Sequence, residues 1–399
     1  MFKASSVKTF KIAFKIYIYK ILNTLSYKKP NIKPKSIIIL RTDAIGDYLL
    51  FCNFLKVIRG HFKDYNITLV GNNAYKDLCL SLSSKWVDSI IWINRNHFLK
   101  KSLYTISLLR KLKLYKYDIL INPIYSRDLI NILIAKSIYA NEKFAPSGDY
   151  INIDKNIKIK SDRIYTKLFP SKNEVIFEFY RNAEFFSKML NKNINIKARL
   201  DTEPFKTKPS IKNYCILFIG ANALYRKWGI NNFAKIGIYL IQKYNQNILI
   251  CGGIEDKDNA KILQNLITNK ILDSKKVLNM VGKTTLIELA TLILHTNLTI
   301  SNETSCAHFS ALLDTNVIVI SNGNHLGRFT PYPYELSNKY KVIFHPFIEA
   351  NIKKYKELSN KFKYKSNLNI NEITTSKVIE KIDEIFIQDI NLNNKYLKK

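Results

Sequence analysis

Two carboxylates and an arginine follow the first apolar run of the chain. The run Ile37-Ile38-Ile39-Leu40 leads into Arg41, and Asp43 and Asp47 then stand on either side of Ala44-Ile45-Gly46. A strand that passes through such a turn into a helix brings the charged side chains to the carboxyl edge of a parallel sheet, where carboxylates are placed for proton transfer. The glycine spacing of a dinucleotide-binding turn is absent. Taken alone, Asp47 is better explained as a carboxylate that complements the dipole at a helix amino terminus.

A basic pair follows the apolar run Tyr214–Ile219 in the second half of the chain. Gly220 and small residues open the turn, and Arg226-Lys227-Trp228 closes it. A strand-to-helix turn of this kind exposes backbone N–H groups, and the two cations add donors that suit a diphosphate. The alternative is a solvated basic pair. Trp228 argues against that alternative, because we expect it to anchor the turn.

A third turn, Ser301–His308, carries polar groups of another kind. Glu303 and His308 could bind sugar or ribose hydroxyls, while Thr304 and Ser305 could hold phosphate together with the helix N–H groups. The alternative is a capped helix start with His308 buried and satisfied in the core.

Two weaker signals lie in the same half. Gly252-Gly253 precedes Glu255 and Asp256, which could bind ribose or sugar hydroxyls, although the glycines equally fit a plain tight turn. Residues 322–329 form a loop rich in Gly and Asn that contains Arg328. We expect no metal site, because the D-x-D pair that ends at Asp258 has no further acids nearby and the six histidines are scattered.

The elements that must position these residues alternate from Ser36 onward. Short β-branched runs and helix-length segments are typical of parallel strands covered on both faces. We expect strands at Ser36–Leu40, Ile67–Val70, Ser89–Ile93 and Asp118–Ile121. We expect helices at Asp47–Phe62, Ala74–Leu82, Leu99–Leu114, Arg127–Lys136 and Asn173–Leu190. Right-handed crossovers between them predict a doubly wound domain over residues 35–190.

Residues 191–213 are Lys-rich, contain two prolines and form the expected linker. The alternation then restarts and predicts a second doubly wound domain over residues 214–350. We expect its strands at Tyr214–Ile219, Asn247–Cys251, Lys276–Met280, Leu298–Ile300 and Asn316–Ile320, and its helices at Asn231–Tyr244, Lys257–Thr268, Leu286–His295 and Ser305–Leu313. Residues 351–399 should hold one amphipathic helix, Ser376–Ile387, before a frayed tail. Ligands would bind in a cleft at the carboxyl ends of the two sets of strands.

The composition points to an anionic partner. The 399 residues include 63 Lys and Arg against 31 Asp and Glu, a net charge of +32, which suits nucleic acid, an acidic membrane or phosphorylated substrates. Residues 1–30 are basic and amphipathic, and we expect that segment either to lie in a membrane interface or to pack on the protein. The five cysteines form no C-x-x-C pair, which predicts reduced core residues in a cytoplasmic protein.

Taken together and in this order, the motifs resemble glycosyltransferase family 9, the bacterial lipopolysaccharide heptosyltransferases. The resemblance extends from Ser36 to Pro333. Its markers are Arg41 through Gly46-Asp47, Gly220 with Arg226-Lys227-Trp228, Gly252-Gly253, Val281-Gly282-Lys283-Thr284 with Leu286, and Asn302-Glu303-Thr304-Ser305 with His308. The resemblance implies an α/β protein of the GT-B fold, with two facing doubly wound Rossmann-like domains.

The resemblance also implies roles for individual residues. Asp47 matches the catalytic aspartate of the family, with Asp43 as its rival or assistant. Lys227 matches the phosphate-binding lysine, and Glu303-Thr304 matches the pair that contacts donor sugar and phosphate. Beside Lys227, Arg226 is expected to bind the donor diphosphate as well. Glu303 stands where the family has Asp, and Ser305 where it has Gly, which indicates a differently held or different donor sugar. Arg41 and Arg328 are expected to contact the acceptor or the loops around it.

The function expected from this resemblance is inverting, metal-independent transfer of a heptose-like sugar. The donor would be a nucleotide sugar, ADP-heptose, and the acceptor an anionic glycolipid such as lipopolysaccharide or a related cell-surface glycan. No cofactor and no nucleic acid are expected. The protein would be cytoplasmic, either free or peripheral on the cytoplasmic face of the inner membrane.

Three alternatives stay open at this point. One is another GT-B transferase, of capsule or O-chain synthesis, that uses a different nucleotide sugar. A second is a basic nucleic-acid-binding protein, although the dispersed lysines show no compact recognition motif. The third is a non-catalytic, membrane-bound scaffold, against which the presence of both Asp47 and Lys227 argues.

Overall fold

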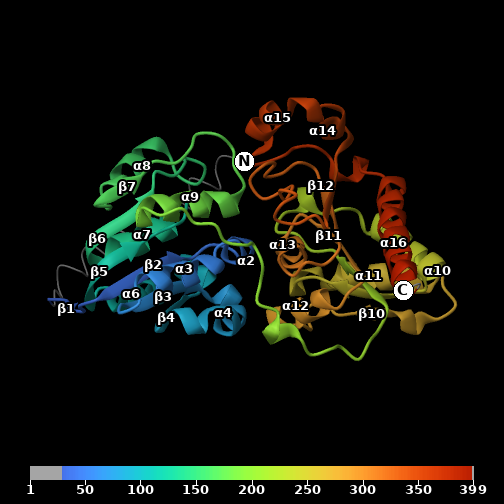
Figure 1. Ribbon diagram of the computed structural model, residues 1–399, viewed down its shortest axis with the longest axis horizontal. Helices are drawn as coiled ribbons and strands as arrows, with labels where there is room; N and C mark the ends of the chain where they lie inside the picture. The colour runs from blue at the N-terminus through green and yellow to red at the C-terminus, as the bar shows by residue number, and fades with distance from the viewer. Residues whose placement is uncertain (1–28, 398–399) are drawn as a thin grey trace. The chain divides into compact units, whose positions relative to one another are not determined.

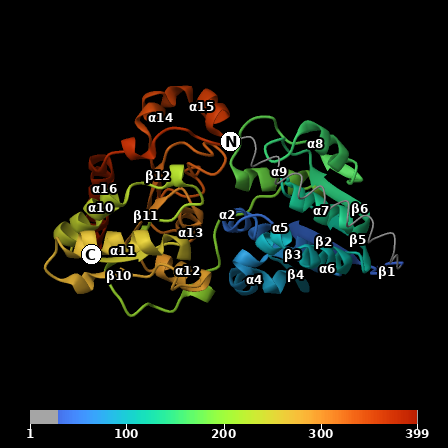
Figure 2. The ribbon, with the colours of Figure 1, turned by 180° about the vertical axis from the view of Figure 1, so that it is seen from behind.

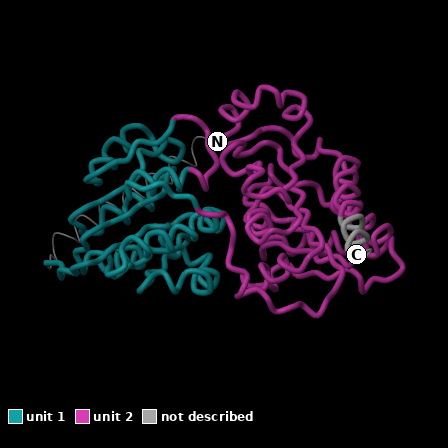
Figure 3. Tube along the Cα trace, viewed as in Figure 1, with its two compact units in different colours: residues 1–172, 181–195 teal, residues 173–180, 196–399 magenta. Residues whose placement is uncertain are grey.

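The chain folds into two compact units in the computed structural model, which describes residues 29–397. Unit 1 comprises Met1–Lys172 and Arg181–Asn195, and unit 2 comprises Asn173–Tyr180 and Ile196–Lys399 (Figure 3). Residues 1–28 of the expected amphipathic segment lie outside the described residues. Within the described part, no helix combines the length and the apolar character needed to cross a bilayer.

Unit 1 is built on a seven-stranded parallel sheet (Figure 1). The strand order is β4-β3-β2-β5-β6-β7, and β1 pairs with β5. The strands are β1 (Asn31–Ile32), β2 (Ser36–Arg41), β3 (Asn66–Asn72), β4 (Ser89–Ile93), β5 (Tyr115–Ile121), β6 (Tyr139–Pro146) and β7 (Lys167–Phe169). The sequence did not predict β6 and β7, because these strands carry charged residues and β7 is only three residues long.

The helices of unit 1 are α2 (Ile45–Leu49), α3 (Asn53–His61), α4 (Lys76–Ser83), α5 (Arg95–Lys100), α6 (Ser102–Leu112), α7 (Leu129–Ser137), α8 (Lys155–Asp162) and most of α9 (Glu178–Leu190). The sequence predicted one helix over Asp47–Phe62, and this prediction is wrong. A turn at residues 50–52 separates α2 from α3, and Leu50, Phe51 and Cys52 are all buried there. The Phe51 N–H donates to the Tyr48 oxygen at 3.0 Å and the Leu55 N–H to the Cys52 oxygen at 3.1 Å, each three residues back along the chain. Similarly, the helix predicted at Leu99–Leu114 is divided at Lys101 into α5 and α6.

Successive side chains of β2 point to opposite faces of the unit 1 sheet, as they do in any strand. Ile38 and Leu40 belong to a core that includes Leu108 of α6 and Ile134 of α7. On another part of the core, Phe54 of α3 stacks on Phe186 of α9, with ring centroids 5.3 Å apart. These helices shield the central strands from water. The buried strand β2 therefore holds its carboxyl end in a defined position.

Unit 2 repeats the design with a six-stranded parallel sheet in the order β10-β9-β8-β11-β12-β13. The strands are β8 (Tyr214–Phe218), β9 (Asn247–Cys251), β10 (Val277–Asn279), β11 (Leu298–Asn302), β12 (Val317–Ser321) and β13 (Tyr340–Phe344). The edge strand β13 was not predicted. It follows a long irregular stretch, and two of its five side chains are half-exposed.

The helices of unit 2 cover both faces of its sheet (Figure 2). They are α10 (Ile230–Tyr244), α11 (Lys257–Thr268), α12 (Leu286–Leu294), α13 (Ser305–Leu312), α14 (Pro346–Ala350), α15 (Tyr355–Phe362) and α16 (Thr375–Leu397). The helix α16 contains the predicted Ser376–Ile387 and continues to Leu397, where the sequence had predicted a frayed tail.

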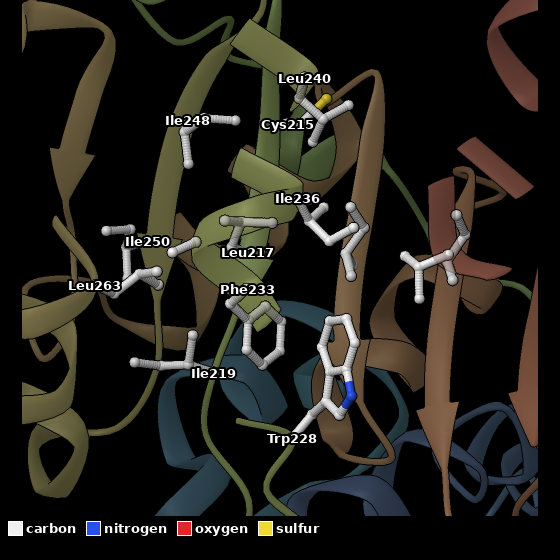
Figure 4. Packing of buried hydrophobic residues seen from close by; sticks show 14 of the residues in the cluster. Cys215, Leu217, Ile219, Trp228, Phe233, Ile236, Leu240, Ile248, Ile250 and Leu263 are labelled. Atoms are coloured by element: carbon white, nitrogen blue, oxygen red, sulfur yellow. The ribbon is translucent and has the colours of Figure 1, made fainter. Parts of the chain in front are cut away.

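One core of unit 2 joins β8 and β9 to α10 and α11. Leu217 and Ile250 of the strands meet Phe233 of α10 and Leu263 of α11, and Trp228 packs at the same cluster (Figure 4). All five cysteines of the chain are buried and free of disulfide bonds, two of them in unit 1 and three in unit 2. Burial raises the pKa of the Cys79 thiol to about 11 and that of Cys251 to about 12.

Candidate active site

Arg41 ends β2 and holds both predicted carboxylates of unit 1. Its side chain is fully buried, and its Nε lies 3.1 Å from Asp43 Oδ1. Its Nη2 donates to the backbone oxygen of Asp47 at 2.9 Å and lies 4.0 Å from Asp47 Oδ1. The guanidinium also stands over the Phe51 ring, 5.0 Å from the centroid. The structure thus places Arg41 beneath the two acids, where it orients them.

Asp47 lies in the first turn of α2, as the sequence predicted for a helix-start carboxylate. Its Oδ2 accepts the Ala44 N–H at 3.2 Å, and its side chain is 23% exposed. Oδ1 therefore has the longer contacts and is the oxygen that remains available to a hydroxyl. Such a group can accept a proton from an approaching acceptor.

The turn between β2 and α2 is held by residues to which the sequence analysis gave no role. Asn72, at the end of β3, donates to the backbone oxygen of Asp43 at 2.8 Å, and Tyr75 donates to that of Arg41. Arg95, at the start of α5, donates to the backbone oxygen of Thr42 at 2.8 Å and pairs with Asp128. Burial raises the pKa of the Tyr75 hydroxyl, which keeps it a neutral donor. In the sequence, these residues are marked only as polar residues that stand at or after the ends of neighbouring strands.

Arg226 and Lys227 are bound to acids at the ends of two other strands of unit 2, so the basic pair is not merely solvated. Arg226 Nη2 donates to the backbone oxygen of Glu303 and lies 3.4 Å from its Oε1. Lys227 Nζ lies 2.5 Å from Asp256 Oδ1. Arg226 thereby ties the turn after β8 to the end of β11, and Lys227 ties it to the end of β9.

Asp256 and Glu255 differ sharply although they are adjacent. Asp256 is 1% exposed, and its Oδ2 accepts the Gly253 N–H at 3.1 Å. Glu255 is exposed to solvent. A Cβ at Gly220 would lie only 2.6 Å from Asp256 Oδ2, so glycine is required where β8 ends. Of the two predicted ribose-binding acids, Glu255 is accessible and Asp256 is enclosed.

Asn302 fixes the geometry between β8 and β11, although the sequence analysis gave it no separate role. Its Oδ1 accepts the Trp228 N–H at 3.0 Å, and its Nδ2 donates to the backbone oxygens of Ile219 and Gly220. The Trp228 indole donates to the Ile373 oxygen at 2.9 Å. Trp228 is therefore a buried anchor for the basic turn, and Figure 4 shows it beside Phe233.

Glu303, Thr304 and Ser305 lie where β11 ends and α13 begins. Thr304 caps α13, because its Oγ1 accepts the Cys306 N–H at 3.3 Å. Thr304 and Ser305 are half-buried, so the amino end of α13 is accessible. Glu303 is only 4% exposed, and its Oε2 accepts from Ser321 Oγ at 2.9 Å. The strand end thus offers a helix amino terminus beside an enclosed carboxylate.

His308 and Arg328, also predicted as site residues, make internal contacts. His308 is 6% exposed, and its Nδ1 lies 2.8 Å from the Tyr332 hydroxyl. Arg328 Nη2 lies 3.2 Å from Glu178 Oε2. Both contacts lie within unit 2 and stabilise the loop after β12.

The carboxyl edge of unit 2 combines two cationic side chains with the amino end of α13, which suits the negative charge of a diphosphate. Over residues 29–397, no group of three or more His, Cys, Asp and Glu side chains is arranged to hold a metal ion.

Known structures share this fold. A glycosyltransferase of family 9 from Veillonella parvula superposes with a TM-score of 0.67 at 15% identity, over 90% of this chain and 99% of that one. The E. coli heptosyltransferase WaaC with ADP gives a TM-score of 0.66 at 15% identity, over 88% and 99%. The E. coli ADP-heptose heptosyltransferase II gives 0.61 at 14% identity, over 89% and 99%. The two-domain GT-B fold predicted from the sequence is therefore confirmed.

A comparison with curated protein sequences finds no match. The model of glycosyltransferase family 9 (heptosyltransferase) matches residues 105–362, more than half of the chain. The match supports the prediction of an enzyme. The chain belongs to glycosyltransferase family 9, and it is a glycosyltransferase.

Proposed function

We propose that this enzyme transfers a heptose-like sugar, with inversion, from ADP-heptose to an anionic glycolipid acceptor such as lipopolysaccharide. The observation that carries the proposal is the carboxyl edge of unit 2, where Arg226 contacts Glu303 next to the amino end of α13 and Lys227 contacts Asp256 after β9. Glu255 is the accessible acid at that edge and is proposed to bind the ribose hydroxyls.

The proposed reaction begins when the acceptor hydroxyl oxygen attacks the anomeric carbon of the donor. The bond between that carbon and the phosphate oxygen breaks on the opposite face, and its electron pair stays with the nucleoside diphosphate. The hydroxyl proton passes to Asp47 Oδ1, because Oδ2 is held by the Ala44 N–H. Arg226, Lys227 and the amino end of α13 stabilise the negative charge that develops on the diphosphate.

The choice of ADP-heptose is supported by two solved structures of similar fold. The E. coli heptosyltransferase WaaC is known with ADP and with ADP-2-deoxy-2-fluoro heptose. The two chains share only 15% sequence identity, which shows a common fold and not a common donor. The donor therefore needs a direct test. Thermal shift against ADP-heptose, GDP-, UDP- and CMP-sugars should give a higher melting temperature with ADP-heptose, since a ligand of the native state stabilises it. A shift with another nucleotide sugar alone would favour the transferase of capsule or O-chain synthesis.

The proposed base is tested by substitution. Asp47→Asn should lower kcat roughly 100-fold or more, as expected when a general base is removed, with ADP release as the readout. Asp43→Asn is the matched control, because Asp43 also faces Arg41. Circular dichroism should show both variants folded. If Asp43→Asn abolished turnover and Asp47→Asn did not, Asp43 would be the base.

A further inference from the structure

The loop after β12, residues Asn322–Thr330, is rigidly tied to the rest of unit 2. Asn322 Nδ2 donates to the backbone oxygens of Tyr225 and Leu368, each at 2.9 Å. Ser366 Oγ donates to the Asn322 oxygen at 2.6 Å, and the Gly327 N–H donates to the Thr330 oxygen at 2.7 Å. We call this segment the β12 loop. Its anchoring means that side chains on it have defined directions.

The β12 loop holds a histidine in a backbone conformation that favours glycine. His325 has φ +55°, between Gly323 at +85° and Gly327 at +80°. In this left-handed region the side chain of an L-residue meets its own backbone, and glycine is the residue without that penalty. Glycine occupies the two flanking positions but not the central one. Strain of this kind is a reason to look for a use of the side chain.

The His325 ring is aimed at the enclosed carboxylate of Glu303. Nδ1 lies 3.3 Å from Glu303 Oε1, and the His325 side chain is 30% exposed against 5% for Glu303. Ser321 donates to the other oxygen of Glu303, and Arg226 Nη2 lies 3.4 Å from Oε1. Arg226 and the ring of His325 are therefore the side chains that face Oε1 of Glu303.

Because Nδ1 of His325 lies beside Glu303, Nε2 is the ring nitrogen left for a ligand. When Nδ1 carries the proton and donates to a carboxylate, the Nε2 of the neutral ring is a hydrogen-bond acceptor. Phe329 supports the ring edge-on, with centroids 5.3 Å apart, and separates it from the buried His308. Of these two histidines, His325 is the one that solvent, and hence a ligand, can reach.

We infer that His325 binds the donor sugar, its Nε2 accepting a hydrogen bond from a sugar hydroxyl. This inference rests on the proposed function. The Glu303 carboxylate is enclosed by Ser321, Arg226 and His325, so of this pair the imidazole is the acceptor that a hydroxyl can reach. Glu303 is then a positioning residue, which fixes the tautomer of His325 and acts on the sugar through it.

The test separates the sugar from the nucleotide. Calorimetry measures the Kd of ADP-heptose and of ADP for wild type, His325→Gly and His325→Asn. His325→Gly should weaken ADP-heptose about 5- to 10-fold, the worth of one neutral hydrogen bond, and leave ADP within about two-fold. His325→Asn tolerates the left-handed backbone and keeps an acceptor, so it should recover part of the affinity. The melting temperature of His325→Gly should equal or exceed that of wild type.

The chain offers a matched control in the same unit. Asn245 caps α10 with φ +51° and precedes β9, at the amino edge of the sheet. Asn245→Gly relieves the same backbone strain and should change neither Kd. Glu303→Gln, which keeps an oxygen toward His325 Nδ1, should lose less ADP-heptose affinity than Glu303→Ala.

Each possible result either supports or overturns the role of His325. An equal loss of ADP and ADP-heptose affinity in His325→Gly would assign the ring to the diphosphate and overturn the inference. Unchanged ADP-heptose affinity in His325→Gly would mean that His325 does not contact the sugar. That result would also overturn the inference, while the proposed function would stand. If wild type bound neither ligand, the proposed function would fail first.

Discussion

Lys227 has two competing partners if it binds a diphosphate, because it already pairs with the enclosed Asp256. Lys227→Ala should lower the free energy of unfolding by about 1–3 kcal/mol, the cost of removing a partner from a buried polar group. It should also weaken ADP binding. The double variant Lys227→Ala/Asp256→Asn should recover the stability, since the neutral amide tolerates burial better, but not the affinity. Urea unfolding and ADP calorimetry measure the two quantities separately.

The double variant distinguishes a direct contact between Lys227 and phosphate from an indirect effect through Asp256. Recovery of ADP affinity together with stability would mean that Lys227 acts only by holding Asp256, and the proposed phosphate contact would be wrong. Loss of affinity in a variant as stable as wild type would support a direct contact.

At this scale the sequence predicts residue types at strand ends but not their partners. Arg226, Lys227 and Glu303 were singled out because charged residues follow apolar runs. That Asp256 is enclosed while Glu255 is exposed could not be predicted, since it depends on the close approach of Gly220 from another strand. His325 was part of a recognised Gly- and Asn-rich loop, but its direction toward Glu303 depends on backbone angles that composition does not reveal.

The side chain of Asn302 makes three hydrogen bonds that join the end of β11 to the residues after β8. Asn302→Ala should lower the free energy of unfolding by about 1–3 kcal/mol for each buried group left without a partner, and should also weaken ADP binding. Asn297→Ala, at the other end of β11, is the matched control and should leave ADP affinity unchanged. Urea denaturation and calorimetry provide both measurements. Equal ADP affinity in the two variants would contradict a positioning role for Asn302.

Lys143 of β6 meets the segment that ends α7, and this contact predicts a pH dependence. Nζ donates to the Ile138 oxygen at 2.5 Å and to that of Ala135 at 3.3 Å. Burial lowers the pKa of Lys143 from 10.5 to about 8. Between these values the unfolded chain binds more protons, so stability from this group rises with pH. The difference in free energy of unfolding, wild type minus Lys143→Met, should increase from pH 8 to 10.5 in urea titrations. A constant difference would contradict the depressed pKa.

Strand prediction succeeded where strands are buried on both faces. The strands β2, β8, β9 and β11 are continuous apolar runs because helices cover them from both sides, and each lies close to its predicted range. The strands β6, β7 and β13 have partly polar faces, which removes that signal. The turn between α2 and α3 was missed because no Gly or Pro marks it, and Leu50, Phe51 and Cys52 continue an apolar run.

The two units should respond differently to nucleotide, because the proposed ADP-binding residues all belong to unit 2. The chain has three tryptophans, Trp86 and Trp92 in unit 1 and Trp228 in unit 2. A Trp86→Phe/Trp92→Phe variant therefore reports unit 2 alone. ADP at 100 times its Kd should stabilise unit 2 by about 2.7 kcal/mol and shift the Trp228 transition to higher urea. Hydrogen exchange of β2 and β5 in unit 1 should stay unchanged, and equal protection of both units would contradict this assignment.

The whole-molecule architecture was predictable from the order of the motifs. Two successive βαβ series, each with charged turns after apolar runs, predicted two doubly wound domains, and this prediction is confirmed. The chain's division was not predicted in one respect. Residues Asn173–Tyr180 belong to unit 2 although Arg181–Asn195 belong to unit 1, so the boundary falls within α9. No local pattern marks it, because a helix remains amphipathic through such a boundary.

The burial of all five cysteines makes the native chain a ready background for site-specific labelling. Alkylating reagents attack the thiolate, and burial both blocks access and raises the thiol pKa, to about 12 for Cys52. A single cysteine introduced at an exposed position, such as Leu272→Cys, would carry a fluorophore while the native thiols stay silent. No native cysteine need be removed, so the packing of either core is left untouched. The native thiols would become reactive on unfolding. Their rate of alkylation would therefore measure the unfolding of each unit.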